Sequence, residues 1–209
     1  MIELPNECFI QIFNNFQHDY ESLYSCLLVN CHWCRIIVPI LWSKIVHKFN
    51  NKNLINTCLL ALNVEEQTSL IPFKILLPNY QKPLFEYTSY VTSVNGFLSD
   101  GVINWLNYNG YKEALFKWET NRDNLVKAVN RSLITMFLRT SKRLENLEVG
   151  FIVDNKFIKN LCKNDAISYL YLYQNWIASE EIAEILKNTT LTSLRLHDAI
   201  RLALMEKMR

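Results

Sequence analysis

Three stretches in the last third of the chain, 144-LENLEV-149, 167-ISYLYL-172 and 191-LTSLRL-196, repeat one pattern of apolar residues. In each stretch aliphatic side chains occupy the first, fourth and sixth positions. The pattern returns after 23 residues (167 − 144) and then after 24 residues (191 − 167). Repetition at this period predicts a short parallel strand followed by a helix in each unit. The helices are expected at Lys156–Cys162 and Glu180–Lys187.

Side chains alternate between the two faces of a strand, so Leu147 and Val149 are expected to point into the core. The residues between the leucines then project from the open face of the sheet. Stacking the strands about 4.8 Å apart predicts three columns of side chains. These columns are Asn146, Tyr169, Ser193; Glu148, Tyr171, Arg195; and Gly150, Tyr173, His197.

Tyr169, Tyr171 and Tyr173, with Glu148 and Arg195 on either side, are the predicted substrate-binding residues. Aromatic and arginine side chains dominate binding hot spots, which favours a recognition surface. A second interpretation is that tyrosine is simply a good strand-forming residue. The sequence leaves both open.

Residues 170–196 closely resemble leucine-rich repeats of the ribonuclease-inhibitor type, through the strand pattern, Asn175-x-Ile177 and the link Asn188-Thr-Thr-Leu-Thr. The first and third units depart from the family, with Ile152 and Ala199 where it places Asn. The resemblance implies a short solenoid with a parallel sheet over residues 141–209. The array is expected to be either a short form or truncated.

Upstream, 26-CLLVNCHWCRIIVPILW-42 places Cys26, Cys31, His32 and Cys34 within nine positions. The apolar spacing predicts that one helix carries all four side chains and ends at Pro39. At about 100° per residue the four side chains would then scatter around the helix axis. A zinc site needs four converging ligands, and a catalytic thiol needs a positioned base. We therefore expect buried cysteines, with no metal ligand, cofactor or catalytic residue.

A first helix is predicted from Phe9, Ile12, Phe13 and Phe16, which follow Leu4-Pro5 at i, i+3, i+4 and i+7. A module of about 40 residues cannot easily bury all of its large apolar side chains. Some of this surface is therefore expected to meet another molecule. Packing on the rest of the chain is the alternative.

The order L-P-x-E at 4–7, Ile12-Phe13, Leu23, Leu28-Val29-x-Cys31-x-Trp33 and Leu41-Trp42 resembles an F-box. Family members usually have Cys where Asn30 stands and a basic residue where Cys31 stands. The resemblance implies a three-helix module that docks on the Skp adaptor of a cullin-RING ubiquitin ligase. Eight residues would divide between adaptor contact and module core: Leu4, Pro5, Ile12, Phe13, Leu28, Val29, Trp33 and Trp42.

Between these two regions, helical spacing is expected over Leu54–Val64, Ile103–Trp118 and Leu125–Leu138. Pro72, Pro78 and Pro83 punctuate a stretch expected to be ordered loop. The predicted core of this region is Trp105, Leu106, Leu115, Phe116, Val129, Leu133 and Phe137.

Composition restricts the function classes. The formal net charge is only +2, from 22 basic and 20 acidic residues, which predicts neither nucleic-acid nor membrane binding. Four glycines form no phosphate-binding loop. The first residues lack the features of a secretory signal, so an intracellular chain in cytoplasm or nucleus is expected, with its six cysteines reduced.

The expected fold class is α plus α/β, with an F-box at 1–46, a helical and irregular connecting region at 47–140 and leucine-rich repeats at 141–209. The expected function is that of a non-catalytic substrate-recognition subunit of a Skp/cullin/F-box ubiquitin ligase. Its repeats would bind an unknown protein substrate. A leucine-rich-repeat interaction scaffold with no link to a ligase is the alternative. An enzyme built on Cys31, His32 and Cys34 is the third class.

Overall fold

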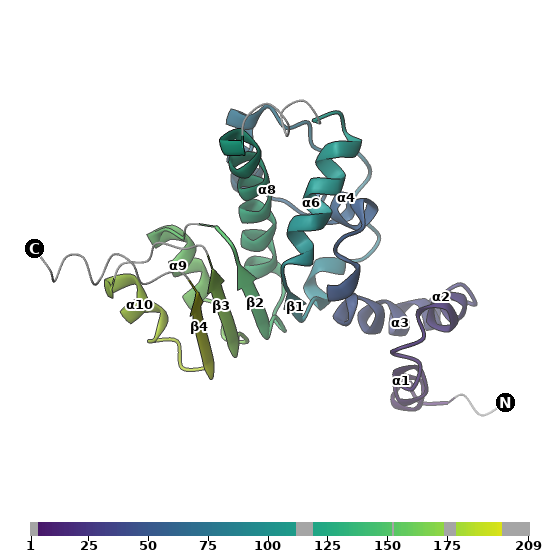
Figure 1. Cartoon of the computed structure of the whole chain (residues 1–209). Helices are drawn as coiled ribbons and strands as arrows, with labels where there is room; N and C mark the ends of the chain where they lie inside the picture. Colours follow the sequence, from purple (N-terminus) through teal and green to yellow (C-terminus); the bar gives the residue numbers. More distant parts are fainter. Residues whose placement is uncertain (1–3, 112–118, 152, 174–178, 198–209) are drawn as a thin grey trace, which may run out of the picture.

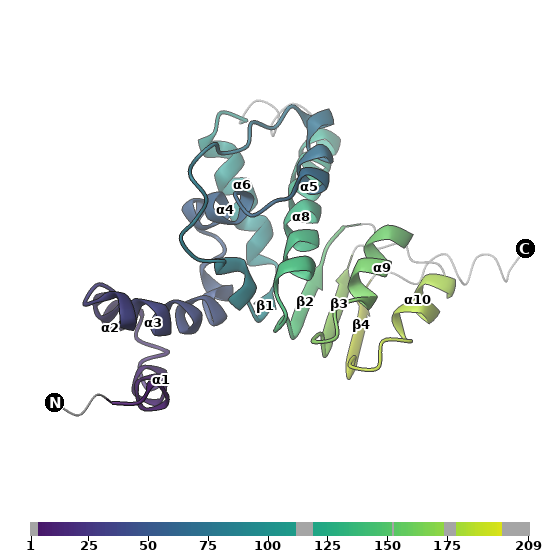
Figure 2. The same ribbon diagram turned by 180° about the vertical axis from the view of Figure 1, so that it is seen from behind.

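The computed structural model describes residues 4–111, 119–151, 153–173 and 179–197. A three-helix module at the N-terminus protrudes from a larger body, at the end of the molecule away from strand β4 (Ser193–His197) (Figures 1 and 2). The body combines helices with a small parallel sheet of four strands, and this mixed architecture is the one predicted.

The module consists of α1 (Asn6–Asn14), α2 (Tyr20–Leu27) and α3 (Cys31–Ser43). Phe13, Leu23 and Ile37 form its buried centre, one residue from each helix. This small core is separate from the core of the body, which runs from Ile45 to Ile185 and so passes through both remaining parts of the chain.

Two expectations for the module were wrong. The cysteine-rich stretch is divided between α2 and α3, because the chain leaves helical geometry at Asn30, whose side chain caps α3 by accepting from the Trp33 N–H at 2.8 Å. The helix also continues through Pro39 to Ser43. Proline removes one helical hydrogen bond, but Ile37 and Val38 beside it are buried, and this packing favours the continued helix.

A row of helices builds the rest of the body core. It contains α4 (Lys52–Leu59), α5 (Val64–Thr68), α6 (Phe97–Tyr108) and α8 (Glu119–Thr140), with 3₁₀ turns η1 (Ile45–Lys48), η2 (Ile71–Phe73) and η3 (Tyr87–Tyr90). The apolar stretch 54–64 therefore spans parts of two helices, since Asn63 begins α5 with a capping box. Of the predicted core, Leu115 and Phe116 lie outside the described residues. The other five are buried: Trp105, Leu106, Val129, Leu133 and Phe137.

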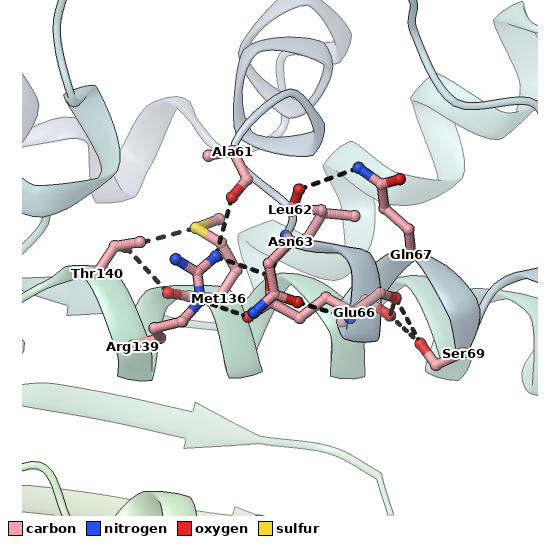
Figure 3. A network of polar contacts seen from close by, with 10 residues as sticks. Ala61, Leu62, Asn63, Glu66, Gln67, Ser69, Met136, Arg139 and Thr140 are labelled. Atoms are coloured by element: carbon pink, nitrogen blue, oxygen red, sulfur yellow. Dashed lines mark hydrogen bonds and ion pairs between the residues drawn. The ribbon is translucent and has the colours of Figure 1, made fainter.

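Glu66 joins α5 to α8 by polar contacts (Figure 3). Its side chain is 3% exposed and accepts hydrogen bonds from Nε and Nη2 of Arg139, at 2.9 and 2.8 Å. Its carboxylate also accepts from the Asn63 N–H at 2.8 Å. Arg139 donates further to the carbonyl of Ala61. A buried carboxylate is thus satisfied by three donors from two segments.

The sheet has the order β1-β2-β3-β4, all parallel. Its strands are β1 (Ser93–Val94), β2 (Asn146–Val149), β3 (Tyr169–Tyr173) and β4 (Ser193–His197). Helices α9 (Asn155–Cys162) and α10 (Ser179–Ile185) follow β2 and β3. On one face of the sheet α9 lies beside α8, and α10 lies beside α9 (Figure 2). Strand β1 was not predicted; it extends the sheet into the region expected to hold only helices and loops.

Candidate functional site

One candidate surface lies on the N-terminal module, where large apolar side chains face solvent. Leu28 and Val29, in the link between α2 and α3, are 67% and 59% exposed. Leu4 is 51% exposed and Ile12 on α1 is 43% exposed. Exposed large apolar side chains concentrated on one small module favour a protein–protein contact surface.

The structure divides the eight predicted adaptor-binding residues into three groups. Phe13 is buried, and Trp33 packs against it with ring centroids 5.1 Å apart, so both belong to the module core. Trp42 turns toward the body and stacks on Tyr87 at 4.8 Å. The remaining five are exposed on the module: Leu4, Pro5, Ile12, Leu28 and Val29.

Three further large apolar or aromatic side chains of the module are exposed and were not among the predicted sites. They are Ile10, Phe16 and Tyr24, at 43%, 41% and 61% exposed. From its spacing, Phe16 was expected to belong to the first helix, in one apolar series with Phe9, Ile12 and Phe13. However, α1 ends at Asn14, so the periodicity no longer applies at position 16.

The cysteine cluster does not converge. Cys26 lies on α2 and Cys31 and Cys34 on α3, and the ring of His32 packs edge-on against Phe9 at 5.5 Å. Within the part of the chain that the structure describes, no three His, Cys, Asp or Glu side chains gather as a metal site would require. The expectation that the cysteines of this stretch are buried was wrong, because Cys31 is exposed and Cys26 and Cys34 are only half-buried. Burial raises the pKa of the Cys58 thiol, the one fully buried cysteine, which makes that thiol unreactive.

The second candidate surface is the face of the sheet opposite the helices. Leu147, Val149, Leu170 and Leu172 are fully buried on the helical side. The alternating residues stand in the predicted columns: Asn146 pairs with Tyr169 and Tyr169 with Ser193, Glu148 pairs with Tyr171 and Tyr171 with Arg195, and Tyr173 pairs with His197. The register predicted from the repeat is therefore confirmed.

The tyrosines of this face are half-buried and in contact with their neighbours. The guanidinium carbon of Arg195 lies 5.5 Å from the ring centroid of Tyr169, a cation–π contact. Tyr171 and Tyr173 have ring centroids 5.4 Å apart with a tilt of 35°. The five predicted substrate-binding residues are thus brought together on one surface.

Gly150 allows the Tyr173 ring to lie across the end of β2. A Cβ at this glycine would stand 2.5 Å from two carbons of that ring. Burial raises the pKa of the Tyr173 hydroxyl, helped by the charges of Glu148 and Asp100 and by Tyr171, whereas a hydrogen bond with Ser99 lowers it. Glu148 accepts a hydrogen bond from the Gly96 N–H at 3.1 Å, just before α6 begins. The tyrosine ring therefore joins the sheet to the start of α6.

Together these observations define a mixed helical and parallel-sheet protein with an exposed apolar surface on its N-terminal module and an aromatic surface on its sheet. Residues 1–48 match the F-box-like family model, so the chain carries an F-box-like domain. This supports a role as a Skp-binding adaptor in a ubiquitin ligase complex, and proteins with this domain are in general non-enzymatic adaptors. No curated protein and no solved structure matches the chain. None of the helices among residues 4–111, 119–151, 153–173 and 179–197 has the length and apolar character needed to cross a membrane.

Proposed function

We propose that this protein is the substrate-recognition subunit of a Skp/cullin/F-box ubiquitin ligase and that it binds a protein substrate on the open face of its sheet. The observation that carries this proposal is the F-box-like match together with the exposed apolar residues of the same module. A ligase of this kind acts inside the cell, in the cytoplasm or nucleus. The ubiquitin transfer itself is assigned to other subunits.

The interpretation of residues 141–209 as a short leucine-rich-repeat solenoid is part of this proposal. It is supported by strand–helix units at a period of 23 and 24 residues and by the matched register of β2, β3 and β4. The domain limits at 46 and 140 stay predictions.

Adaptor contact is proposed for Leu4, Pro5, Ile12, Leu28 and Val29, which are exposed. Phe13 and Trp33 would act indirectly, because they fill the module core on which the exposed residues are mounted.

Co-purification with a Skp adaptor tests the proposal. The double variant Leu28→Ser, Val29→Ser removes two exposed side chains from a non-helical link, so the fold should persist. We expect the affinity for the adaptor to fall at least about tenfold. The matched control is Leu76→Ser, Leu84→Ser, which removes two body side chains that are 81% and 87% exposed and should leave adaptor binding unchanged.

If the wild-type chain fails to bind any Skp adaptor, the ligase proposal is wrong. The second candidate, a repeat-based interaction scaffold with no ligase link, would then be favoured, because the tyrosine-rich face does not depend on the module. If the wild-type chain and the Leu28→Ser, Val29→Ser variant bind the adaptor equally well, only the proposed contact residues are refuted.

A further inference from the structure

The open face of the sheet is asymmetric in charge. Glu148 on β2 and Asp100 on α6 stand on one side of the tyrosines, and Arg195 and His197 on β4 stand on the other. The three tyrosine rings lie between them. A partner that complements this face in charge would therefore carry positive charge where it lies beside β2.

On this face the chain already holds a cation on a tyrosine. The Arg195 guanidinium stands beside Tyr171 in the register but lies over the ring of Tyr169, 5.5 Å from its centroid. The Tyr171 ring, by contrast, has no cationic side chain over it in the described ranges, and its register neighbour on β2 is Glu148. A ring face next to a carboxylate attracts a cation through both the ring quadrupole and the ionic charge.

The carboxylates at this end stand at the start of α6 and, within the described ranges, have no cationic side chain as a partner. Glu148 uses one oxygen to accept from the Gly96 N–H, and neither Glu148 nor Asp100 forms an ion pair among the parts of the chain that the structure describes. Gly150 leaves room for the Tyr173 ring, whose centroid lies 5.4 Å from that of Tyr171, and Glu148 is the register partner of Tyr171. The strand register and Gly150 therefore bring these three residues together.

We propose that the sheet face binds a basic segment of the protein substrate, with a Lys or Arg side chain seated between Tyr171 and Glu148. The inference rests on the proposed function, because it names the class of substrate segment for the same face. A basic segment is chosen because its positive charge complements the carboxylates of Glu148 and Asp100 on the β2 side. The charge of the whole chain, +2, would by itself disfavour such a ligand, so a preference for it must come from the local face.

The test uses two fluorescein-labelled peptides of twelve residues that repeat Gly-Ser-Lys or Gly-Ser-Glu, titrated with the full-length chain and followed by fluorescence anisotropy. We expect the lysine peptide to bind at least about fivefold more tightly than the glutamate peptide. Tyr171→Ala and Glu148→Gln should each lower the affinity for the lysine peptide about fivefold. Tyr171→Phe should keep it, because the ring is retained.

Two control variants match these changes elsewhere on the chain. Tyr80→Ala removes an exposed tyrosine of the body, and Glu145→Gln removes one exposed charge just before β2. Both should leave the affinity for the lysine peptide within twofold of wild type. Equal binding of the two peptides, tighter binding of the glutamate peptide, or an equal loss in variants and controls would overturn the inference.

Adaptor co-purification of the same samples separates this inference from the ligase proposal. If the chain binds the adaptor but does not prefer the lysine peptide to the glutamate peptide, only the proposed site for a basic segment is refuted. Selective lysine-peptide binding by a chain that binds no adaptor would support the basic-segment site and refute the ligase role.

Discussion

At the scale of single residues, Asp154 shows how one carboxylate can serve two elements. It caps α9 by accepting from the Phe157 N–H at 2.8 Å, and it pairs with Arg131 on α8. Burial alone would raise the pKa of Asp154. The hydrogen bonds from Arg131 and Phe157, with the charges of Arg131 and Lys156, outweigh that effect and hold the pKa below its ordinary value of 3.8.

A lowered pKa in the folded state means that ionised Asp154 stabilises the fold above pH 3.8 and that this contribution disappears as the pH falls through the lower, folded-state pKa. Asp154→Asn can still cap α9 but has no charge. We expect wild type to exceed this variant in unfolding free energy by no more than about 1 kcal/mol at pH 7, because the side chain is half-exposed. Urea titrations should show the difference shrinking below pH 4. If the difference in unfolding free energy stays constant down to about pH 2, the ionised Asp154 carboxylate does not stabilise the fold. When Arg131 is replaced by Gln, the effect of Asp154→Asn on the unfolding free energy should become smaller.

At the scale of elements, one buried carboxylate links α5 to α8. Glu66 completes the capping box of α5 and accepts two hydrogen bonds from Arg139 of α8 (Figure 3). Its neighbour Glu65 is 67% exposed and pairs with Lys156 at the surface. The two adjacent glutamates therefore provide a matched comparison of buried and exposed ion pairs.

We expect Glu66→Ala to lower the free energy of unfolding by about 3 kcal/mol, because it leaves Arg139 and the cap without their acceptor. Glu66→Gln should lie between this variant and wild type, since it preserves the cap but not the charge. Glu65→Ala should change the free energy by no more than about 0.5 kcal/mol. Chemical denaturation measures all three, and equal losses for Glu65→Ala and Glu66→Ala would contradict the role of burial.

At the scale of the whole molecule, α3 connects the module to the body. Trp42 at its end stacks on Tyr87 and packs against the body core, and the carbonyl of Ser43 accepts from Thr92 at 2.7 Å. Tyr20 of α2 donates its hydroxyl to the carbonyl of Lys44. A groove of about 790 Å³, lined by Trp42 among others, runs along this junction. Since α3 runs without a break from the module to the body, the contacts of Trp42, Ser43 and Tyr20 set the position of the module relative to the sheet.

Trp42→Ala should therefore lower the stability of the fold and leave the affinity for the adaptor nearly unchanged. We expect a loss of about 2 kcal/mol in the free energy of unfolding, because the ring is only partly buried. Affinity for the Skp adaptor should stay within threefold of wild type. Trp42→Phe, the control, keeps an aromatic ring on Tyr87 and should lose less stability. Unchanged stability together with lost adaptor binding would place Trp42 in the adaptor contact instead.

Different parts of the structure could be foreseen to different degrees. The register of β2, β3 and β4 followed from the leucine spacing, because side-chain alternation is a property of any strand. The break at Asn30 was missed because apolar residues continue through it, although an asparagine three residues before Trp33 is itself a capping signal. Strand β1 was missed because two residues, Ser93 and Val94, carry no period.

By itself the sequence determined which residues face the sheet's two sides and which stretch of the chain carries the F-box-like pattern, because both are encoded in local spacing. Only the tertiary structure decided how the eight predicted adaptor residues divide, since the burial of Phe13 and Trp33 depends on α1 packing against α3. It also placed Trp42 against the body and the Tyr173 ring on Gly150. Contacts between residues distant in sequence leave no periodic signal, so packing alone could reveal them.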